Sequence, residues 1–164
     1  IIAESFSSRG DDPWNFDKIR NLNYFLEIAV PRWQNGEIKG TDVNIKHYIG
    51  EAYFMRAWQY LGKLQTLGDF PIVRNTLPDE QEALTEASHR RPRNEEARII
   101  ISDVDSAIML LKHNPAGGKN RITRNAALLV KSRTALFEAS WETIIKVRTV
   151  YREVPDGRVL PLLI

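Results

Sequence analysis

Apolar residues recur at intervals of three and four residues in four stretches of the chain, which is the pattern of helices with one buried face. The four apolar stripes comprise, in chain order, Phe16, Ile19, Leu22, Leu26 and Ala29; Ile45, Ile49, Ala52, Tyr53, Tyr60 and Leu64; Ala97, Ile101, Val104, Ile108 and Leu111; and Ala126, Leu129, Val130, Leu136 and Phe137. Helices that bury such stripes against one another predict a mainly all-α fold class.

Residues that start and stop helices set the expected limits of the first two. In the first helix, Asp12 is a candidate N-cap, Pro13 suits the first helical position, and Pro31 is expected to stop the helix. The second helix is expected to start near Thr41, a candidate N-cap, and to run to about Leu67. A loop is therefore expected directly after the proline that ends the first helix.

The third and fourth helices are expected to pair as a hairpin. The third starts at Asn94 and has two glutamates in its first turn, where acidic side chains favour the positive end of the helix dipole. The fourth starts at Thr123, and residues Asn114–Arg121 form the turn between them. A hairpin of this size is typical of tetratricopeptide repeats, but the strict signature of that repeat is absent. The pattern alone predicts a repeat-like helical hairpin.

The stretch GEAYFMRAWQYLGKLQTLGDFPIV, within the second helix and beyond it, combines large rings with small residues. Its alanines allow a neighbouring helix to approach closely, and the rings fill the space beside the contact. Gly68 is expected to end the helix in a left-handed conformation, and Phe70–Val73 to cross the bundle as a short strand or extended segment. A long polar connection over residues 74–93 follows, with a short helix expected at Asp79–Ala87.

Composition and charge exclude several classes of protein. The 23 basic and 21 acidic residues among 164 give a net charge of +2, which is too balanced to imply nucleic acid. The chain has no cysteine, and no apolar run approaches the roughly 20 residues of a membrane helix. It begins IIAESFSS, without an initiator methionine, a basic signal-peptide region or a lipid-accepting cysteine, so we expect an N-terminal truncation.

The polar residues do not group into a catalytic or metal-binding motif. Asp103 and Asp105 are two positions apart on a helix, so their carboxylates point to different faces and are expected to be solvated or to pair with Arg56 or Arg133. The three histidines, at positions 47, 89 and 113, are scattered, which argues against a metal site. The basic run His89–Arg93 is either an anion-binding loop or a solvated loop before an acidic helix start. Without a nucleophile elbow or a phosphate-binding glycine loop, no catalytic residue and no cofactor are predicted.

Four segments in a fixed order carry a family resemblance: WNFDKIRNLNYFLE, GEAYFMRAWQYLGKLQTLGDFPIV, RNEEARIIISDVDSAIMLL and GKNRITRNAALLVKSRTALFEASWE. They resemble segments of the SusD/RagB family of outer-membrane nutrient-uptake lipoproteins of Gram-negative bacteria. One segment alone is a weak signal, whereas the order and spacing of all four are specific. The resemblance covers about Trp14 to Glu142, and the family's lipid-bearing N-terminus and large C-terminal portion have no counterpart in this sequence.

The resemblance implies a SusD-like fold of tetratricopeptide-like helical hairpins with long irregular loops, present over residues 1–142 as part of a larger domain. It implies a non-enzymatic, surface-exposed glycan-binding protein of the cell outer membrane. The implied partners are an oligosaccharide and a TonB-dependent outer-membrane transporter, with membrane contact only through a lipid anchor absent from this chain, and no nucleic acid. From the pattern alone, a helical repeat scaffold for protein–protein interaction is the alternative.

Two tryptophans are candidates for carbohydrate binding. Sugars require a flat apolar face under the C–H side of a pyranose and planar polar groups for the hydroxyls. Trp33, expected in a loop beside a glutamine and an asparagine, matches that chemistry, and Trp14 is the second candidate. The alternative for each is structural, because Trp33 can fill a gap beneath its loop and Trp14 can anchor a helix start. Trp58 and Trp141 are expected to pack within helices.

The tail Thr143–Ile164 differs in pattern from the rest of the chain, because the helical stripe ends and β-branched residues alternate with basic ones. Members of the resembled family commonly continue instead with an aromatic-His-Lys-Gly-Thr run and a loop rich in glycine and proline. A reading frame moved by one nucleotide allows codons for Tyr-His-Lys-Gly-Thr-Asp-Arg-Val-Pro-Gly-Gly-Pro-Gly-Trp-Pro-Gly. We interpret the tail as the out-of-frame product of a frameshift near Glu142; the alternative is a genuine divergent strand of a shorter protein.

The nucleotide sequence of the locus is expected to spell that glycine-rich string in the shifted frame over the codons of Thr143–Val159. A tail that was never selected to pack is also expected to lack a fixed place on the fold. Sequencing the locus checks the interpretation, and codons that cannot encode the string would contradict it.

Overall fold

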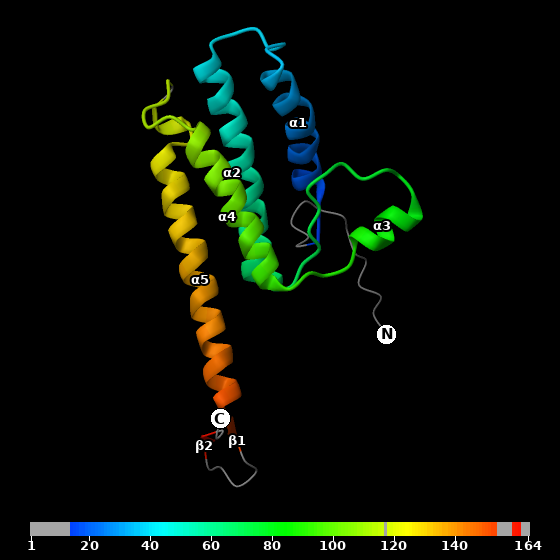
Figure 1. Cartoon of the computed structure of the whole chain (residues 1–164), viewed down its shortest axis with the longest axis vertical. Helices are drawn as coiled ribbons and strands as arrows, with labels where there is room; N and C mark the ends of the chain where they lie inside the picture. The colour runs from blue at the N-terminus through cyan, green and yellow to red at the C-terminus, as the bar shows by residue number, and fades with distance from the viewer. Residues whose placement is uncertain (1–13, 117, 154–158, 162–164) are drawn as a thin grey trace, which may run out of the picture.

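The computed structural model describes residues 14–116, 118–153 and 159–161, and four long helices lie side by side in it (Figure 1). The helices are α1 (Asp17–Gln34), α2 (Asp42–Leu67), α4 (Arg93–Leu110) and α5 (Arg124–Val150). The smaller elements are helix α3 (Gln81–Ala87), the 3-10 turn η1 (Gly118–Asn120), and strands β1 (Tyr151–Glu153) and β2 (Val159–Pro161), which pair antiparallel. The predicted mainly all-α fold class is confirmed.

The long helices pack in chain order as two hairpins. Helix α1 pairs with α2, α4 pairs with α5, and the hairpins meet where α2 packs against α4. Each helix thus contacts its neighbours in the sequence, which is the arrangement of stacked helical repeats. The short helix α3 lies beside α1 on the side away from α5 (Figure 1). The predicted hairpin of the third and fourth long helices is confirmed.

The main core lies where α2, α4 and α5 meet, and a smaller cluster joins α1 to α2. The main core includes Ala57, Tyr60, Leu64, Phe70, Ile100, Val104, Ala107 and Ala127, and the smaller cluster consists of Leu26, Ala29, Ile49 and Ala52. A glycine sets the closest approach of α2 to α4, because a Cβ at Gly50 would lie only 3.0 Å from Cβ of Leu110 and 3.1 Å from Cγ of Leu111. The small residues of α2 therefore serve close helix contact, as predicted.

Helix α1 starts later than predicted. It begins at Asp17, whose N–H donates to Oδ1 of Asn15 (2.7 Å), while the predicted capping residues Asp12 and Pro13 lie outside the described residues. The described residues before the helix are not helical, and the rings of Trp14 and Phe16 among them stack on Phe70. Tertiary contact thus overrides the local start signal.

The prediction that Pro31 stops α1 is wrong. The helix continues through this proline to Gln34, and the N–H of Asn35 bonds to the carbonyl oxygen of Pro31 (2.9 Å). A proline in a last turn removes one backbone donor but leaves its own carbonyl available to the next turn. Trp33 consequently lies on the helix and not in the loop where it was predicted.

The start of α4 is capped by a residue distant in sequence. The predicted N-cap Asn94 lies within the helix, which begins at Arg93, and the N–H of Arg93 donates to Oδ1 of Asp69 (3.0 Å). Asp69 follows the glycine that ends α2, so one turn both ends α2 and caps α4. Helix α5 was predicted to start at Thr123 and starts one residue later, at Arg124, with Oγ1 of Thr123 accepting from the N–H of Ala126 (3.2 Å) as an N-cap.

Gly68 ends α2 with a positive φ, as predicted. Its φ is +74° and its ψ is −115°, and its N–H donates to the carbonyl oxygen of Leu64 (3.2 Å). This ψ lies outside the left-handed helical region that was predicted, in a region that glycine adopts far more readily than other residues. An added Cβ would meet no atom within 4 Å, so a side chain here is opposed by backbone strain alone.

Gly68→Ala is expected to lower the free energy of unfolding by about 1–3 kcal/mol, because alanine is strained in this conformation. Gly62→Ala is the matched control, since a Cβ there also meets no atom within 4 Å but the backbone is helical. The control is expected to raise the free energy of unfolding by up to about 1 kcal/mol. Urea denaturation measures both, and equal shifts of the two midpoints would contradict the assigned conformation.

The chain after Gly68 runs as an extended segment, one of the two forms predicted, and α3 forms within the predicted Asp79–Ala87. Phe70 pairs with Arg91 in an isolated antiparallel bridge, in which the N–H of Arg91 donates to the carbonyl oxygen of Phe70 (3.1 Å). This bridge closes the long connection between α2 and α4 at its base, so the connection forms a loop that carries α3 beside the bundle.

Helix α5 continues to Val150, past the predicted end of the helical pattern at Glu142. Residues 139–146 are all exposed, although Arg93 at the start of α4 lies over the ring of Trp141 (4.1 Å), and the last part of α5 extends beyond the ends of the other helices (Figure 1). A helix nucleated by packed turns can propagate without further packing, since each added residue adds one hydrogen bond. Residues 154–158 and 162–164 of the tail lie outside the described residues, and the frameshift stays a prediction.

Candidate functional site: an aromatic corner beside a cleft

Trp33 lies on the last turn of α1 and links that helix to the start of α2. Its half-buried ring packs on the smaller core cluster, its Nε1 donates to Oδ1 of Asp42 (2.7 Å), and Nζ of Lys46 lies 5.7 Å from the ring centroid. The hydrogen bonds from Lys46 and then Trp33 lower the pKa of Asp42. Three contacts within the chain thus hold this indole in place, which favours a structural role for Trp33 over sugar binding. Its role in sugar binding stays a prediction.

Trp14 lies at the opposite end of α1 from Trp33. The 18 residues of α1 extend for about 27 Å at 1.5 Å per residue, so the two predicted sugar-binding tryptophans do not share a site. The ring of Trp14 stacks on Phe70 with 5.2 Å between centroids, and 39% of Trp14 is exposed. The guanidinium carbon of Arg90 lies 4.8 Å from the centroid of the indole.

Trp14, Phe16 and Phe70 form a cluster of stacked rings that we call the aromatic corner. Phe70 is fully buried and stacks on both of the other rings, with 4.9 Å between its centroid and that of Phe16. From α2, Nζ of Lys63 lies 4.7 Å from the Phe70 centroid and donates to the carbonyl oxygen of Asn15 (2.8 Å). The corner joins the start of α1 to the segment after α2, so Trp14 has a structural role and an exposed surface at once.

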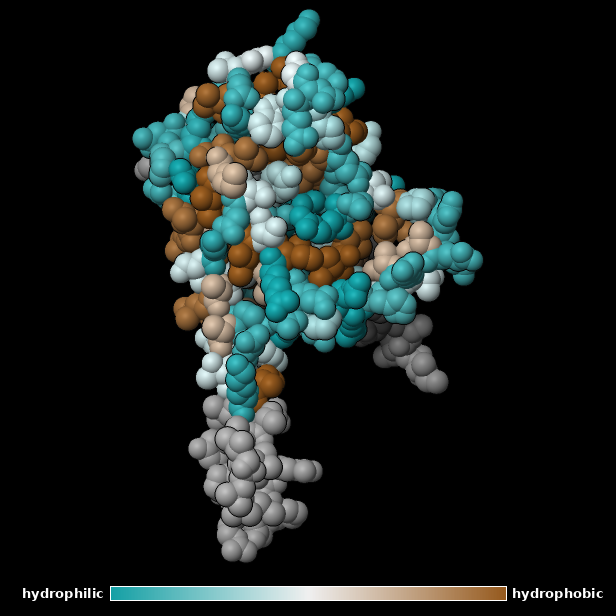
Figure 2. All heavy atoms as spheres, in the orientation of Figure 1, coloured by the Kyte–Doolittle hydropathy of each residue, from teal (hydrophilic) through white to brown (hydrophobic). Residues whose placement is uncertain are grey.

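A cleft of about 490 Å³ opens beside the aromatic corner, between α1, the extended segment and α3. Its lining is mainly apolar and includes Phe16, Ile19 and Leu84, with polar groups from Arg20, Asn75, Asp79 and Ser88. Hydrophobic surface is visible where the bundle meets α3 (Figure 2). An aromatic ring with a few planar polar side chains is the chemistry that a sugar site requires.

A buried ion pair between α2 and α4 lies behind the extended segment. Nε and Nη2 of Arg56 donate to the two carboxylate oxygens of Asp103 at 2.7 and 2.8 Å, and both side chains are buried. The predicted pairing of these two residues is confirmed. Arg133, the other predicted partner, is exposed, and Asp105 pairs with Lys131 (2.6 Å) instead.

The same network fixes the backbone of the extended segment. The carbonyl oxygen of Val73 accepts from Nδ2 of Asn23 (2.9 Å) and from the hydroxyl of Tyr60 (2.7 Å), and Nη1 of Arg56 donates to the carbonyl oxygen of Arg74 (3.3 Å). Burial raises the pKa of Tyr60 to about 12, so the hydroxyl keeps its proton as a donor. These hydrogen bonds attach the extended segment to α1 and α2. The segment in this position forms one wall of the cleft.

A second buried polar group lies at the start of α4. Glu96 is fully buried, and neither carboxylate oxygen has a hydrogen-bond partner in the described part of the chain. Beside it, Nε of Arg93 donates to Oε2 of Glu138 (3.0 Å), which ties α4 to α5. Burial raises the pKa of Glu96 to about 8, although Arg93 and Lys63 act to lower it. Burial thus favours the protonated form of Glu96.

The histidines do not meet at one place. His47 is buried; its Nδ1 accepts from the N–H of Lys112 (3.3 Å), its Nε2 lies 3.4 Å from Oε1 of Glu51, and burial lowers its pKa. His89 and His113 are exposed. Among the described residues, no group of three or more His, Asp or Glu side chains is placed to hold a metal ion, and no described helix has both the length and the apolar character to cross a membrane.

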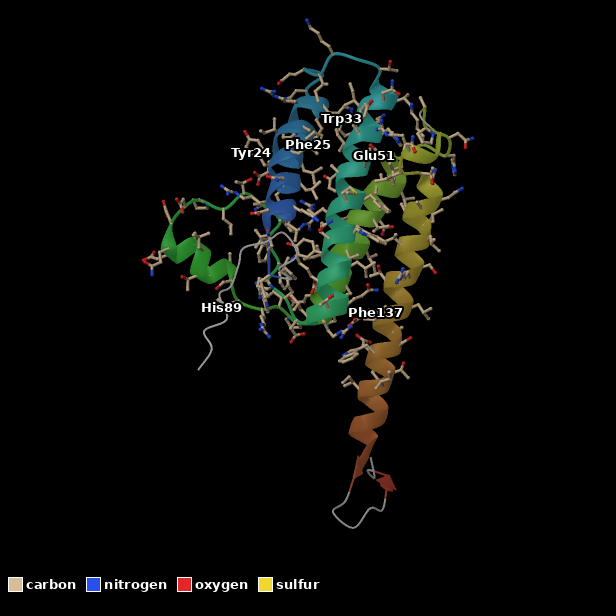
Figure 3. The ribbon with its side chains drawn as sticks, turned by 180° about the vertical axis from the view of Figure 1, so that it is seen from behind. Tyr24, Phe25, Trp33, Glu51, His89 and Phe137 are labelled. Carbon is tan, nitrogen blue, oxygen red and sulfur yellow. The ribbon has the colours of Figure 1, made fainter. Side chains whose placement is uncertain are left out.

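The basic run His89–Arg93 is attached to the aromatic corner and to α5. Arg90 lies over Trp14, Arg91 pairs with the backbone of Phe70, and Arg93 binds Glu138. Figure 3 shows His89, the first residue of the run, near the lower end of the bundle and well away from Trp33. The run is therefore exposed but attached to the bundle, and whether it binds anions stays a prediction. Arg20 is a cleft residue that the sequence analysis missed, because no local signal distinguishes it from other surface arginines.

The known proteins that resemble this chain in sequence or in structure point to one family. A model of the SusD-like family, described as starch-binding and associating with the outer membrane, matches residues 13–136, whereas no curated protein matches the chain. A SusD-like protein from Bacteroides fragilis is 26% identical, with a TM-score of 0.66 over 83% of this chain and 25% of that one.

Two further solved structures share the fold. A laminarin-binding SusD-like protein is 15% identical, with a TM-score of 0.62 over 74% of this chain and 25% of that one. Surface glycan-binding protein A from Bacteroides uniformis is 16% identical, with a TM-score of 0.59 over 78% of this chain and 27% of that one. The chain thus spans about a quarter of the length of these relatives. Because the family model covers most of the chain and the helical hairpins match in space, this protein belongs to the SusD-like family.

Proposed function

We propose that this chain is part of a non-enzymatic glycan-binding protein exposed at the outer membrane, which passes oligosaccharides to a TonB-dependent transporter. The match of the SusD-like family model over residues 13–136 carries the proposal. Two proteins that share the fold are named for binding laminarin and surface glycans, which supports a carbohydrate ligand. Because the chain spans about a quarter of those proteins, the partnership with a transporter is proposed for the whole protein.

The residues of the cleft support binding and not catalysis. Glycoside hydrolysis uses a pair of carboxyl groups on either side of the scissile bond. Among the described residues that line the cleft, Asp79 carries the only carboxylate. The planar polar groups of Arg20 and Asn75 and the ring of Phe16 are instead suited to orienting a sugar.

The alternative, a helical scaffold that binds peptides, is disfavoured by the course of the extended segment. Helical repeats bind partners along the concave surface formed by successive repeats. Here the chain's own segment is bonded to Asn23 of α1 and Tyr60 of α2, and Arg74 reaches Asp103 of α4 (3.2 Å). The surface shared by these three helices is thus already covered by an extended stretch of the same chain.

Isothermal titration of the purified chain with laminarin, maltooligosaccharides and a peptide library tests the proposal. Saturable binding of at least one glycan in the micromolar to millimolar range, without peptide binding, is the expected result. Binding of peptides alone would favour the scaffold, and no binding of any glycan would contradict the proposal. Co-purification of the full-length protein with an outer-membrane barrel tests the transporter partnership separately.

A further inference from the structure

We propose that the aromatic corner and the adjoining cleft form a subsite for an anionic glycan, in which Trp14 stacks on a pyranose ring and Arg90 binds the carboxylate of a uronic acid. The inference rests on the proposed function and narrows it to a class of glycan. It is carried by the position of an arginine over an exposed tryptophan, and the ring that supports this tryptophan, Phe70, also stacks on Phe16 of the cleft lining.

Trp14 is held as a rigid platform. Phe70, which is fully buried, supports the indole by stacking on it, and Phe16 stacks on Phe70 in turn. Trp14 is 39% exposed, but Phe70 stacks on its ring and Arg90 lies over it, so a sugar packs its C–H face on the indole only once Arg90 has moved aside. Phe16, which stacks on the same Phe70 ring, lines the cleft.

Arg90 is poised to exchange its contact with Trp14 for a contact with a ligand. Its guanidinium lies 4.8 Å from the indole centroid, its side chain is exposed, and it forms no ion pair with any described residue. An exposed cation–π contact is weak, whereas a carboxylate offers the guanidinium two parallel charge-assisted hydrogen bonds. The bridge between Phe70 and Arg91 keeps the backbone next to Arg90 in place during that exchange.

The charge around the subsite favours an anion. Arg20 lines the cleft and, like Arg90 and Arg91, has no ion-pair partner among the described residues. Asp79 is the single acidic residue in the described lining. Asp79 balances Arg20 in that lining, and Glu80, Glu82 and Glu86 line a separate hollow with His89, so the local positive charge comes from Arg90 and Arg91 beside the aromatic corner. Positive charge at this place raises the local concentration of an anionic ligand relative to a neutral one. A uronic acid thus offers a ring to the indole and a carboxylate to guanidinium groups that form no ion pair within the described part of the chain.

Titration of the purified chain with oligogalacturonate and with a neutral maltooligosaccharide of the same length tests the inference. The wild type is expected to bind oligogalacturonate at least about tenfold more tightly, as one charge-assisted bidentate pair provides. Arg90→Gln is expected to remove most of that preference while leaving the weaker neutral binding. Trp14→Ala is expected to weaken binding of both glycans, with circular dichroism as a check on its fold.

Two control substitutions distinguish binding at this subsite from a general effect of the protein's charge or of its exposed tryptophans. Arg98→Gln removes the same charge from an exposed position on α4, and Trp58→Ala removes a tryptophan that is 44% exposed on α2; neither is expected to change binding. An equal effect of Arg90→Gln and Arg98→Gln, or equal affinity of the wild type for both glycans, overturns the inference. Binding of the neutral glycan alone overturns it and leaves the proposed function, whereas binding of no glycan overturns both. If the Trp14→Ala variant does not fold, Arg90→Gln decides the result, because Arg90 is exposed and its substitution is not expected to unfold the protein.

Discussion

Asp103→Ala is expected to lower the free energy of unfolding by about 3–5 kcal/mol, because it leaves the guanidinium of Arg56 buried without its counter-charge. The two side chains are 4% and 1% exposed, so water cannot take the place of the lost carboxylate. The same carboxylate also binds Nη2 of Arg74 (3.2 Å), which belongs to the extended segment. The substitution therefore removes a contact between α2 and α4 and loosens one wall of the cleft.

Urea denaturation measures this effect, and Asp105→Ala is the control on the same helix. The pair of Asp105 with Lys131 is nearly half exposed on both sides, and such pairs contribute about 0–1 kcal/mol. Loosening of the segment has its own readout, since trypsin is expected to cut after Arg74 faster in Asp103→Ala than in the control. Equal losses of stability in the two variants would show that burial does not decide the strength of the Asp103 pair.

Glu96→Gln is expected to stabilise the protein at neutral and mildly alkaline pH and to flatten its stability between pH 4.5 and about 8. Burial raises the pKa of Glu96 from 4.5 to about 8, so within this window the folded state holds a proton that the unfolded state has released. The stability that this group contributes is highest below pH 4.5 and falls as pH rises, by about 1.4 kcal/mol per pH unit and by about 5 kcal/mol over the whole window. Glutamine has the same shape and no proton to lose.

The difference between the wild-type and Glu96→Gln unfolding free energies, measured at each pH, isolates this group. Other groups that titrate in the window cancel in that difference; one is His47, whose lowered pKa makes stability rise with pH. Glu95→Gln, one position earlier, keeps the buried acid and is expected to keep the slope. Parallel curves for wild type and Glu96→Gln would contradict the assignment of a proton to Glu96 in the folded state.

The four long helices could be predicted from the sequence, because their apolar stripes repeat at the helical period and lie within single elements. The cap at Thr123 and the stop at Gly68 were predictable for the same reason, since each acts on backbone groups within four residues of itself. The resemblance to the SusD family rested on segments within these helices and their turns, and the family comparison confirms it. Local signals thus determined the fold class, the hairpins and the family.

One error arose where a distant residue replaced a local one, and another where a local stop signal did not end the helix. Asn94 is a good cap by its chemistry, but Asp69 takes that role from 24 positions away because the turn after α2 lies against the start of α4. Pro31 is a strong stop signal, yet α1 continues through it, and this moves Trp33 from a loop to a helix.

Arg56 and Asp103 could be predicted as possible partners, and Trp14 and Trp33 as candidate sugar platforms, from the order of the residues. The burial of the ion pair, the hydrogen bond that holds Trp33 to Asp42 and the position of Arg90 over Trp14 depend on how the helices pack. The physical reason is that burial, and the strength of a charge that depends on it, is a property of how several helices meet and not of any one segment. The cleft beside the aromatic corner is likewise made by three segments that are separate in sequence, α1, the extended segment and α3, so no single stretch encodes it.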